Sequence, residues 1–316
     1  MIKIFPLLAL VACATNVGAP DIVAPKVVAQ PAAPVIEATS LLGKPLARPS
    51  ASAEAQAQRE KDLEAARAEY EKSPTADNLI WIGRRLAYLG RYGDAIKSFA
   101  EGAEKFPSDA RFLRHRGHRF ITIREFDKAS ADLQKATLLT RGKPDEVEPD
   151  GVANARNTPI GSLQSNICYH LGLAHYLKGD FERALPVYQR CVAEASNPDR
   201  LVSSSHWLYM TLRRLGRQKD AEAILETINP GLDVIENFTY HKLMLMYRGE
   251  IAEDELMKEP MAPSDAPGLL YGIGNWHLYN GDPAGAEAIF RRIVGGDGWT
   301  SFGTIAAEAE LARGVR

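Results

Sequence analysis

From residue 76 to residue 294, apolar side chains recur every three or four positions, in segments separated by short turns that contain glycine. This spacing places the apolar side chains on one face of an α-helix, and the segments are too long for typical strands. Each segment is followed by a second one of the same kind, as in residues 78–107. The pattern therefore predicts an all-α fold built from antiparallel helix pairs.

The helix pairs repeat with a fixed period. Residues 110–137 follow the arrangement of residues 78–107, and Ala129 stands 34 positions after Ala95 (129 − 95). Small residues at such positions let the two helices of a pair approach closely, and a larger side chain there would overpack the core. One pair alone cannot bury its apolar faces, so we expect successive pairs to stack.

Three further segments continue the repeat, namely residues 166–192, 204–228 and 268–294. A period of 34 residues, with glycine in the first helix and alanine in the second, resembles the tetratricopeptide repeat (TPR). The resemblance covers residues 76–294 and implies a right-handed superhelical solenoid of antiparallel helix pairs. It also implies a non-catalytic protein that holds protein or peptide partners.

Two parts of the chain depart from the repeat. Residues 138–165 form an insertion rich in proline, glycine and asparagine, which we expect to be solvated. In the alternative, the insertion closes over the binding face through Asn154, Arg156 and Asn157. Residues 237–257 indicate a degenerate helix pair without the alanine signature.

The last segment, residues 303–313, has the pattern of a short amphipathic helix. The terminal repeat of a stack exposes an apolar face unless another element covers it. We therefore expect this helix to cap the exposed end of the solenoid, which as a whole spans residues 74–316.

The first twelve residues differ from the rest of the chain. Lys3 precedes a short apolar run, far below the roughly 20 residues of a membrane-spanning helix, so residues 1–12 indicate a signal peptide. The residues that end at Cys13 resemble the lipobox of bacterial lipoproteins, which implies lipidation of Cys13. Ala14 follows in place of aspartate, which implies an outer-membrane lipoprotein facing the periplasm. A soluble periplasmic protein is the alternative.

Residues 13–50 are rich in proline, alanine and valine. Proline lacks a backbone N–H group and fixes φ, so we expect an extended linker without helix or sheet. In residues 51–73 the composition changes to alanine, glutamate, glutamine, arginine and lysine, which favour helices. We expect a solvated lead-in helix there.

Charge and cysteine content narrow the classes of partner and site. The formal net charge is −2, whereas nucleic-acid binding usually needs a basic excess, so we expect no nucleic-acid partner. Cys168 and Cys191 lie on the two helices of one repeat. A disulfide between them is one alternative, but buried free thiols are the simpler expectation.

The chain carries no pattern of a known active site. Its 7 histidines all lie in predicted helices, and none occurs in the HExxH spacing of zinc enzymes. The sequence also lacks a nucleophile elbow and a phosphate-binding P-loop. We therefore expect no enzymatic activity, no cofactor and no metal site.

The concave face of the predicted solenoid is the candidate binding site, because the first helix of each pair lines that face. Basic, amide and aromatic side chains lie in or beside its stripe: Arg84, Tyr88, Arg111, Arg114, His118, Asn166, Tyr169, His206, Arg213, Arg214, Tyr271 and Asn275. Guanidinium groups pair well with carboxylates, so we expect an acidic peptide or a carboxylate-bearing ligand to bind there. In the alternative, these residues are polar only because the face is wet.

The sequence thus predicts a scaffold or adaptor lipoprotein that binds protein partners of the cell envelope through this groove. The alternative is a protein that binds or senses a small ligand, such as an anionic metabolite or a glycan or peptide fragment. An envelope hydrolase that uses the histidines is a more remote alternative.

Overall fold

The computed structural model describes the following residues: Met1, 33–149, 151, 153–258 and 264–315. The predicted signal peptide after Met1, the predicted lipidation site Cys13 and most of the linker lie outside them. The chain divides into two units, Met1–Ala33 and Pro34–Arg316, and the elements described below all belong to the second. Among the described residues, the helices lack the combination of length and apolar character that crossing a bilayer requires.

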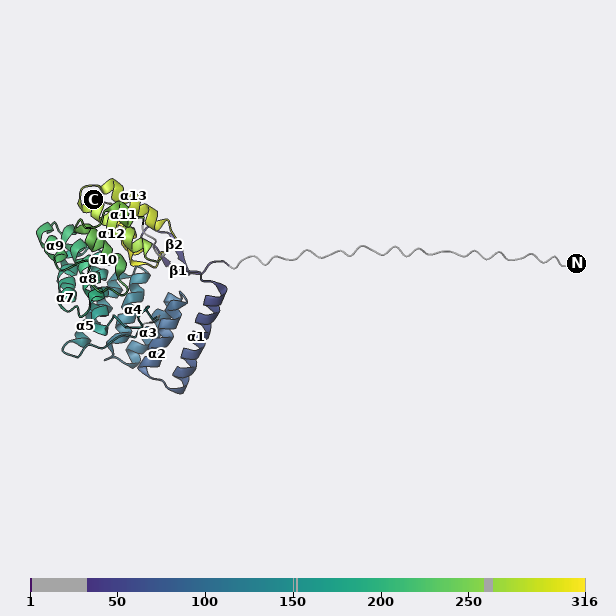
Figure 1. Cartoon of the computed structure of the whole chain (residues 1–316). Helices are drawn as coiled ribbons and strands as arrows, with labels where there is room; N and C mark the ends of the chain where they lie inside the picture. Colours follow the sequence, from purple (N-terminus) through teal and green to yellow (C-terminus); the bar gives the residue numbers. More distant parts are fainter. Residues whose placement is uncertain (2–32, 150, 152, 259–263, 316) are drawn as a thin grey trace. The chain divides into compact units, whose positions relative to one another are not determined.

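The second unit is almost entirely helical (Figure 1). Its helices are, in chain order, α1 (Ala53–Lys72), α2 (Ala76–Tyr88), α3 (Tyr92–Lys105), α4 (Ala110–Thr122), α5 (Phe126–Thr140), α6 (Leu163–Leu177), α7 (Phe181–Ala193), α8 (Pro198–Arg214), α9 (Gln218–Leu225), α10 (Phe238–Tyr247), α11 (Glu253–Leu256), α12 (Ala266–Tyr279), α13 (Pro283–Val294) and α14 (Phe302–Arg313). Helices α2–α3, α4–α5, α6–α7, α8–α9 and α12–α13 pack as the predicted pairs, and neighbouring pairs stack. The all-α solenoid of antiparallel helix pairs is therefore confirmed.

Small residues permit the close packing within each pair. A Cβ atom on Gly83 of α2 would lie 2.3 Å from the ring of Phe99 on α3, which is closer than real contacts allow. The pair α6–α7 repeats this arrangement, because a Cβ atom on Gly172 would lie 2.7 Å from the Tyr188 ring. Ala95 on α3 is completely buried. Larger side chains at these positions would push the paired helices apart.

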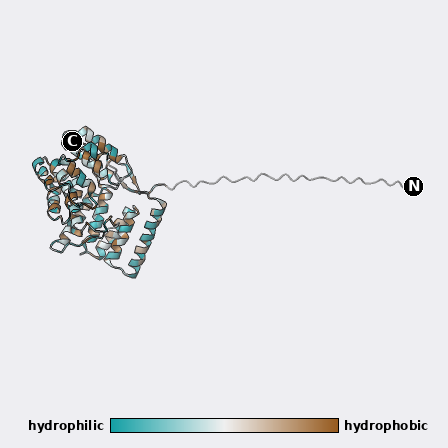
Figure 2. Ribbon diagram, in the orientation of Figure 1, coloured by the Kyte–Doolittle hydropathy of each residue, from teal (hydrophilic) through white to brown (hydrophobic). Residues whose placement is uncertain are grey.

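Helix α1 is the predicted lead-in helix, and its side chains are mostly hydrophilic (Figure 2). Leu63 is its buried residue. Beside it, the carboxylate of Asp62 lies 3.2 Å from the guanidinium group of Arg85 on α2. Helix α1 therefore extends the stack at its N-terminal end while most of its surface stays in water.

The expectation of a linker without sheet is wrong for the part nearest the solenoid. Strands β1 (Ile36–Thr39) and β2 (Pro45–Ala47) form an antiparallel hairpin. Pro45 is the first residue of its strand, a position where the missing N–H group is tolerated. The proline content therefore did not prevent a short sheet.

Distant parts of the chain hold the hairpin in place. The carboxylate of Glu37 accepts a hydrogen bond from the backbone N–H of Tyr92, at 2.9 Å. The indole N–H of Trp299 donates to the carbonyl oxygen of Ala47, also at 2.9 Å. Leu46 is buried in the same cluster as Tyr92 and Trp299. These contacts stabilise a hairpin that the local sequence does not predict.

Helix α14 packs against α12 and α13, the last helix pair of the stack, where the capping helix was predicted. It also packs against α6, and residues 303–310 are all buried. Since α6 and α12 are the first helices of their pairs, α14 lies on the concave side of the solenoid. Its approach is close: a Cβ atom on Gly303 would lie 2.2 Å from the carbonyl oxygen of Pro267.

Two buried carboxylates bind α14 to the rest of the solenoid. Glu308 pairs with Arg124 in the turn between α4 and α5, at 2.5 Å. Glu310 pairs with Arg214 at the end of α8 and with Arg313, both at 2.7 Å. The chain itself thus supplies acidic groups to the concave face.

Cys168 on α6 and Cys191 on α7 form a disulfide, with their Cα atoms 5.8 Å apart. The expectation of buried free thiols is therefore wrong. The two helices of this pair approach so closely, at Gly172 and Tyr188, that cysteines at facing positions fall within bonding distance.

Candidate binding pocket on the concave face

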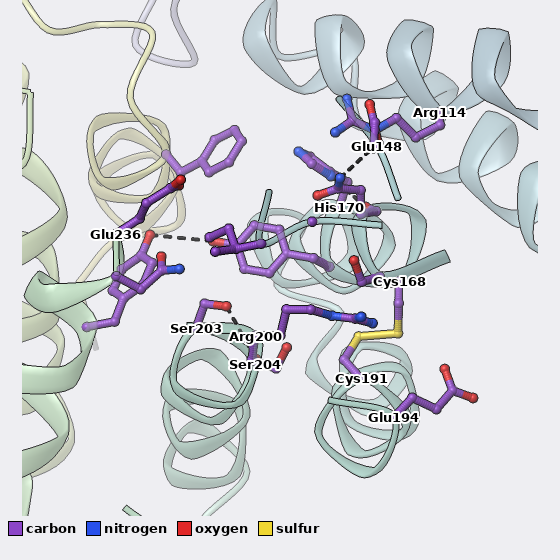
Figure 3. Close-up of a pocket in the computed structure, with 18 of the residues that line it drawn as sticks. Arg114, Glu148, Cys168, His170, Cys191, Glu194, Arg200, Ser203, Ser204 and Glu236 are labelled. Atoms are coloured by element: carbon purple, nitrogen blue, oxygen red, sulfur yellow. Dashed lines mark hydrogen bonds and ion pairs between the residues drawn. A yellow bond between two sulfur atoms is a disulfide. The ribbon is translucent and has the colours of Figure 1, made fainter. Parts of the chain in front are cut away.

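A pocket of about 430 Å³ lies beside the first helices of successive pairs. Its walls come from α6, α8 and the start of α10, with the insertion and Phe302 of α14 closing two sides. Figure 3 shows Arg114 and Glu148 on one side of the pocket and Glu236 on the opposite side. The disulfide between Cys168 and Cys191 forms part of the wall. This feature is called the concave pocket below.

Most of the insertion is exposed, as expected, but it contacts the rest of the chain at two points. At one end Glu148 is buried against α4 and α6. At the other end Arg156 pairs with Asp233 at 2.7 Å, and Asn154 donates to Glu236 at 2.6 Å. Asn154 and Arg156 thus contact the segment before α10, as in the alternative interpretation, whereas Asn157 is exposed.

Glu148 lies beside three polar side chains at the edge of the pocket. Its carboxylate lies 2.9 Å from Nε of Arg114 and 3.2 Å from Nε2 of His115. The side-chain amide of Asn166 also donates to it, at 2.8 Å. This one carboxylate thus neutralises Arg114 and joins the insertion to both α4 and α6.

Arg84 lies beside this group and has neutral partners. Its Nη2 group donates to the carbonyl oxygen of Pro149 at 2.8 Å and to the phenol oxygen of Tyr88 at 3.1 Å. The guanidinium group also lies 4.3 Å from the ring centre of Trp81, a cation–π contact. Arg84 is 9% exposed, so its charge is largely removed from water.

Aromatic side chains line the α10 side of the pocket. The phenol oxygens of Tyr169 and Tyr240 lie 3.4 Å apart, and the indole N–H of Trp207 donates to Tyr169 at 2.8 Å. The ring of Phe302 lies 6.2 Å from that of Tyr169. The pocket therefore combines a cationic wall with a wall of ordered aromatic rings.

Two histidines of the concave face, His170 and His206, are buried and neutral, and His118 is half-buried. His118 and His170 lie with their rings 4.4 Å apart, and both approach Phe302. Burial, together with the charge of Arg114, lowers the pKa of His170 to about 3. Burial alone lowers the pKa of His206 to about 3. At neutral pH these side chains therefore contribute polarity but no charge.

The structure brings part of the predicted groove together at the concave pocket. Arg84, Arg114, Asn166 and Tyr169 line it directly. Tyr88 holds Arg84 through its phenol oxygen. His118, on the same helix as Arg114, stacks beside His170 and Phe302 at the edge of the pocket.

A second part of the predicted groove lies beneath α14. Arg214 pairs with Glu310, and Tyr271 donates to the phenol oxygen of Tyr176 at 2.9 Å. Asn275 also donates to Tyr176, at 2.7 Å. These residues hold the last helix in place and do not face an open groove.

The other predicted residues also have partners within the chain. Arg111 pairs with Asp109 at 2.6 Å and with Asp77 at 2.5 Å. Arg213 donates to the side-chain oxygen of Asn280 at 2.7 Å. His206 is 1% exposed and stacks on Tyr240. The prediction of one continuous basic groove therefore does not match the arrangement of these side chains.

Sequence reasoning missed several residues of the pocket, among them Glu148, Arg200, Tyr240 and Phe302. One signal was present, since an acidic segment of the insertion follows the most basic helix of the repeat. Within the described part of the chain, His, Cys, Asp and Glu side chains form no group that would hold a metal ion.

Two segments of the chain, residues 82–146 and 165–198, match sequence models described as tetratricopeptide repeat. The chain contains tetratricopeptide repeats. The remaining helix pairs continue the stack on the C-terminal side of the matched segments.

The chain is also similar to the BBSome complex member BBS4. It is 27% identical to the protein of Bos taurus over 138 residues, which are 43% of this chain and 22% of that protein. It is 24% identical to the protein of Mus musculus over 136 residues, again 43% of this chain and 22% of that protein. The aligned part thus spans about a fifth of the length of these relatives.

Solved structures of repeat proteins are similar at low identity. YrrB, described as a TPR protein with an unusual peptide-binding site, is 15% identical with a TM-score of 0.43, and the match covers 74% of this chain and 92% of that one. A tetratricopeptide repeat protein from Parabacteroides merdae is 12% identical with a TM-score of 0.46, over 76% of this chain and 87% of that one. Identity this low carries no information about function.

Proposed function

We propose that the protein is a non-catalytic TPR scaffold that binds a protein partner in the bacterial cell envelope. The observation that supports this proposal is the stack of TPR helix pairs. Repeats of this kind contact mainly their neighbours, and their stacking creates an extended surface on which partners bind.

The proposed location is the periplasmic side of the outer membrane, with a lipid on Cys13 as the anchor. The disulfide between Cys168 and Cys191 supports an oxidising compartment, because disulfides form in the periplasm and are rare in the cytosol. A soluble periplasmic protein is the alternative. Substituting Cys13→Ala separates the two, since loss of the lipid moves the protein from the membrane fraction to the soluble fraction.

The partner is proposed to contact the concave pocket and not the whole concave face. Helix α14 fills the part beneath α12, and Arg111, Arg114 and Arg214 already pair with carboxylates of the chain. The pocket keeps half-buried side chains such as Tyr169 and Asn166 at its surface. A partner segment of limited length therefore fits the geometry better than a long acidic tail.

Affinity capture from detergent-solubilised envelopes tests this proposal. The Ser203→Trp variant fills the pocket without removing an ion pair, because Ser203 donates only to the carbonyl oxygen of Arg200, at 3.4 Å. Thr227→Trp is the matched control, since exposed Thr227 makes the same kind of bond to the carbonyl oxygen of Ile224, at 2.9 Å.

We expect the wild-type and Thr227→Trp baits to capture the same partner protein, and the Ser203→Trp bait to lose it. A partner retained equally by all three would place the binding surface away from the pocket. Wild-type bait that captures nothing above an untagged control would contradict the scaffold proposal itself.

A further inference from the structure

We propose that the concave pocket is an oxyanion site, which binds a carboxylate or phosphate group at Arg84 and Arg114 and an aromatic or apolar ring at Tyr169, Tyr240 and Phe302. The inference rests on the proposed function only in placing a ligand in this pocket. It specifies the chemistry of that ligand. It is tested separately from the proposed function, because binding of a free anion is measured without any partner protein.

The α4 side of the pocket carries more positive than negative charge. Arg84 and Arg114 are each 9% exposed, and Arg119, further along α4 and outside the lining of the pocket, is half-buried. Among the described residues, Glu148 is the carboxylate within ion-pair distance of this group, and it pairs with Arg114. Buried charges are stable when they are paired, so the excess of guanidinium groups favours an added anion.

The electrostatic coupling of the three arginines agrees with this count. Burial, followed by the positive charges of Arg114 and Arg84, lowers the pKa of Arg119 to about 10. Burial likewise lowers the pKa of Arg114, although Glu148 opposes the shift. An arginine loses basicity in this way when its neighbours carry the same charge and water is scarce. A bound oxyanion would raise the pKa values of Arg114 and Arg119 again.

The guanidinium group of Arg84 keeps donors that are not used within the protein. Arg84 donates through Nε and Nη2, to Tyr88 and to Pro149. Within the described part of the chain, its Nη1 group makes no hydrogen bond to protein. A guanidinium group recognises a planar carboxylate or a phosphate through two parallel N–H donors. Arg84 therefore has donors to offer as well as charge.

The other acidic side chains that line the pocket are exposed to solvent. Glu194 and Glu236 also line the pocket, but both are exposed, and Glu236 lies on the side opposite Arg114 (Figure 3). Water and salt screen exposed charges far more than buried ones. Arg200 lies between the two sides and is 3.9 Å from Asp145. The anionic group is therefore expected at Arg84 and Arg114.

The shape of the site limits the rest of the ligand. The pocket holds about 430 Å³, with the insertion on one side and Phe302 of α14 on another. Cavities of this size bury small molecules or short chain ends, not long extended peptides. The rings of Tyr169, Tyr240 and Phe302 offer a flat apolar surface for a ring next to the anion. Two kinds of ligand carry an anion next to a ring in this way. One is a free small molecule, and the other is the carboxylate end of a peptide.

Binding of matched probes to the full chain tests the proposal by calorimetry. The probes are 3-phenylpropionate and phenyl phosphate, with the neutral 3-phenylpropanamide as the comparison. N-acetylphenylalanine presents the same carboxylate as a peptide end, and its rank against 3-phenylpropionate identifies the source. We expect the anions to bind at least about tenfold more tightly than the amide, as a charged hydrogen bond would require.

Substitutions locate the anion within the protein. Arg84→Gln is expected to weaken binding of both anions about tenfold or more and to leave the weak binding of the amide unchanged. Arg213→Gln is the matched control, because Arg213 also stacks at 4.3 Å, on the Tyr279 ring, and donates to a tyrosine and a backbone carbonyl, but lies outside the pocket. Ser203→Trp, which keeps every arginine, should abolish binding of all probes.

Three results would overturn the proposal. One is equal affinity for 3-phenylpropionate and its amide, and another is the absence of heat from every probe at millimolar concentration. The third is wild-type affinity in Arg84→Gln. If Arg84→Gln lowers the melting temperature so far that it unfolds, Ser203→Trp decides, because retained anion binding in that variant would place the anion elsewhere.

Discussion

Removing the carboxylate of Glu308 should destabilise the whole solenoid. Glu308 forms two contacts with Arg124, at 2.5 and 3.0 Å, and accepts a hydrogen bond from the backbone N–H of Leu41 at 3.3 Å. Arg124 in turn donates to the carbonyl oxygen of Trp299 at 2.8 Å. One side chain of α14 therefore joins the hairpin, the turn between α4 and α5 and the C-terminal helices.

The expected loss follows from burial of the pair. The side chains of Arg124 and Glu308 are 3% and 4% exposed. Removing one member of a buried ion pair typically costs about 3–5 kcal/mol, because the remaining charge stays buried and unpaired. We expect Glu308→Ala to lower the free energy of unfolding by that amount, a large share of the roughly 5–15 kcal/mol of a typical domain.

Urea denaturation under oxidising conditions, followed by far-ultraviolet circular dichroism, measures this loss. The matched control is Glu287→Ala, which breaks a pair with Arg291 whose side chains are 43% and 69% exposed and should cost less than about 1 kcal/mol. The double variant Arg124→Met with Glu308→Leu should recover much of the stability, because it leaves no charge behind.

The reasoning would be refuted if Glu308→Ala cost no more than Glu287→Ala. It would also be refuted if the double variant were as unstable as the single one, since the loss would then come from altered packing and not from an unpaired charge. An unchanged denaturant dependence, with only the midpoint shifted, would confirm that the change lies in stability.

Two further predictions follow from the same structure. Replacing Cys168 and Cys191 by alanine should lower the free energy of unfolding by about 2–4 kcal/mol, measured in urea against wild type with and without reductant; equal midpoints would contradict a stabilising disulfide. Burial lowers the pKa of His277, but its bonds to Glu253 and Asp282 outweigh that effect and raise it above 6.5. The ion pairs of His277 therefore stabilise the fold fully below the unfolded pKa, and this stabilisation is lost as pH rises through the folded pKa. His277→Asn should flatten this part of the curve of unfolding free energy against pH. A curve identical to that of the wild type would be inconsistent with the ion pairs.

The helix pairs were predictable because their determinants are local. The glycine at Gly83 and the alanine at Ala95 belong to one repeat, and the two helices meet within that stretch. The same pattern recurs 34 positions later at Gly117 and Ala129 (117 − 83, 129 − 95). Any chain with these small residues in register can pack its helices in pairs, whatever the rest of the molecule does.

The candidate site was only partly predictable. Helix periodicity correctly places Arg84, Arg114, Asn166 and Tyr169 beside one pocket. It did not reveal that Glu148 of the insertion would pair with Arg114, because an insertion has no periodicity from which its path follows. The predicted preference for an anion therefore narrows to the neighbouring Arg84 and Arg114, of whose two guanidinium charges Glu148 offsets one.

Local patterns of residues account for the repeat, the stacking of helix pairs and the face that becomes concave, since each depends on contacts within one or two repeats. The tertiary structure alone decided what occupies that face. Arg124 and Glu308 are 184 positions apart, and Trp299 and Ala47 are 252 positions apart, yet these contacts place α14 and the hairpin. Such pairings depend on the curvature summed over every repeat between them, which no local pattern of residues encodes.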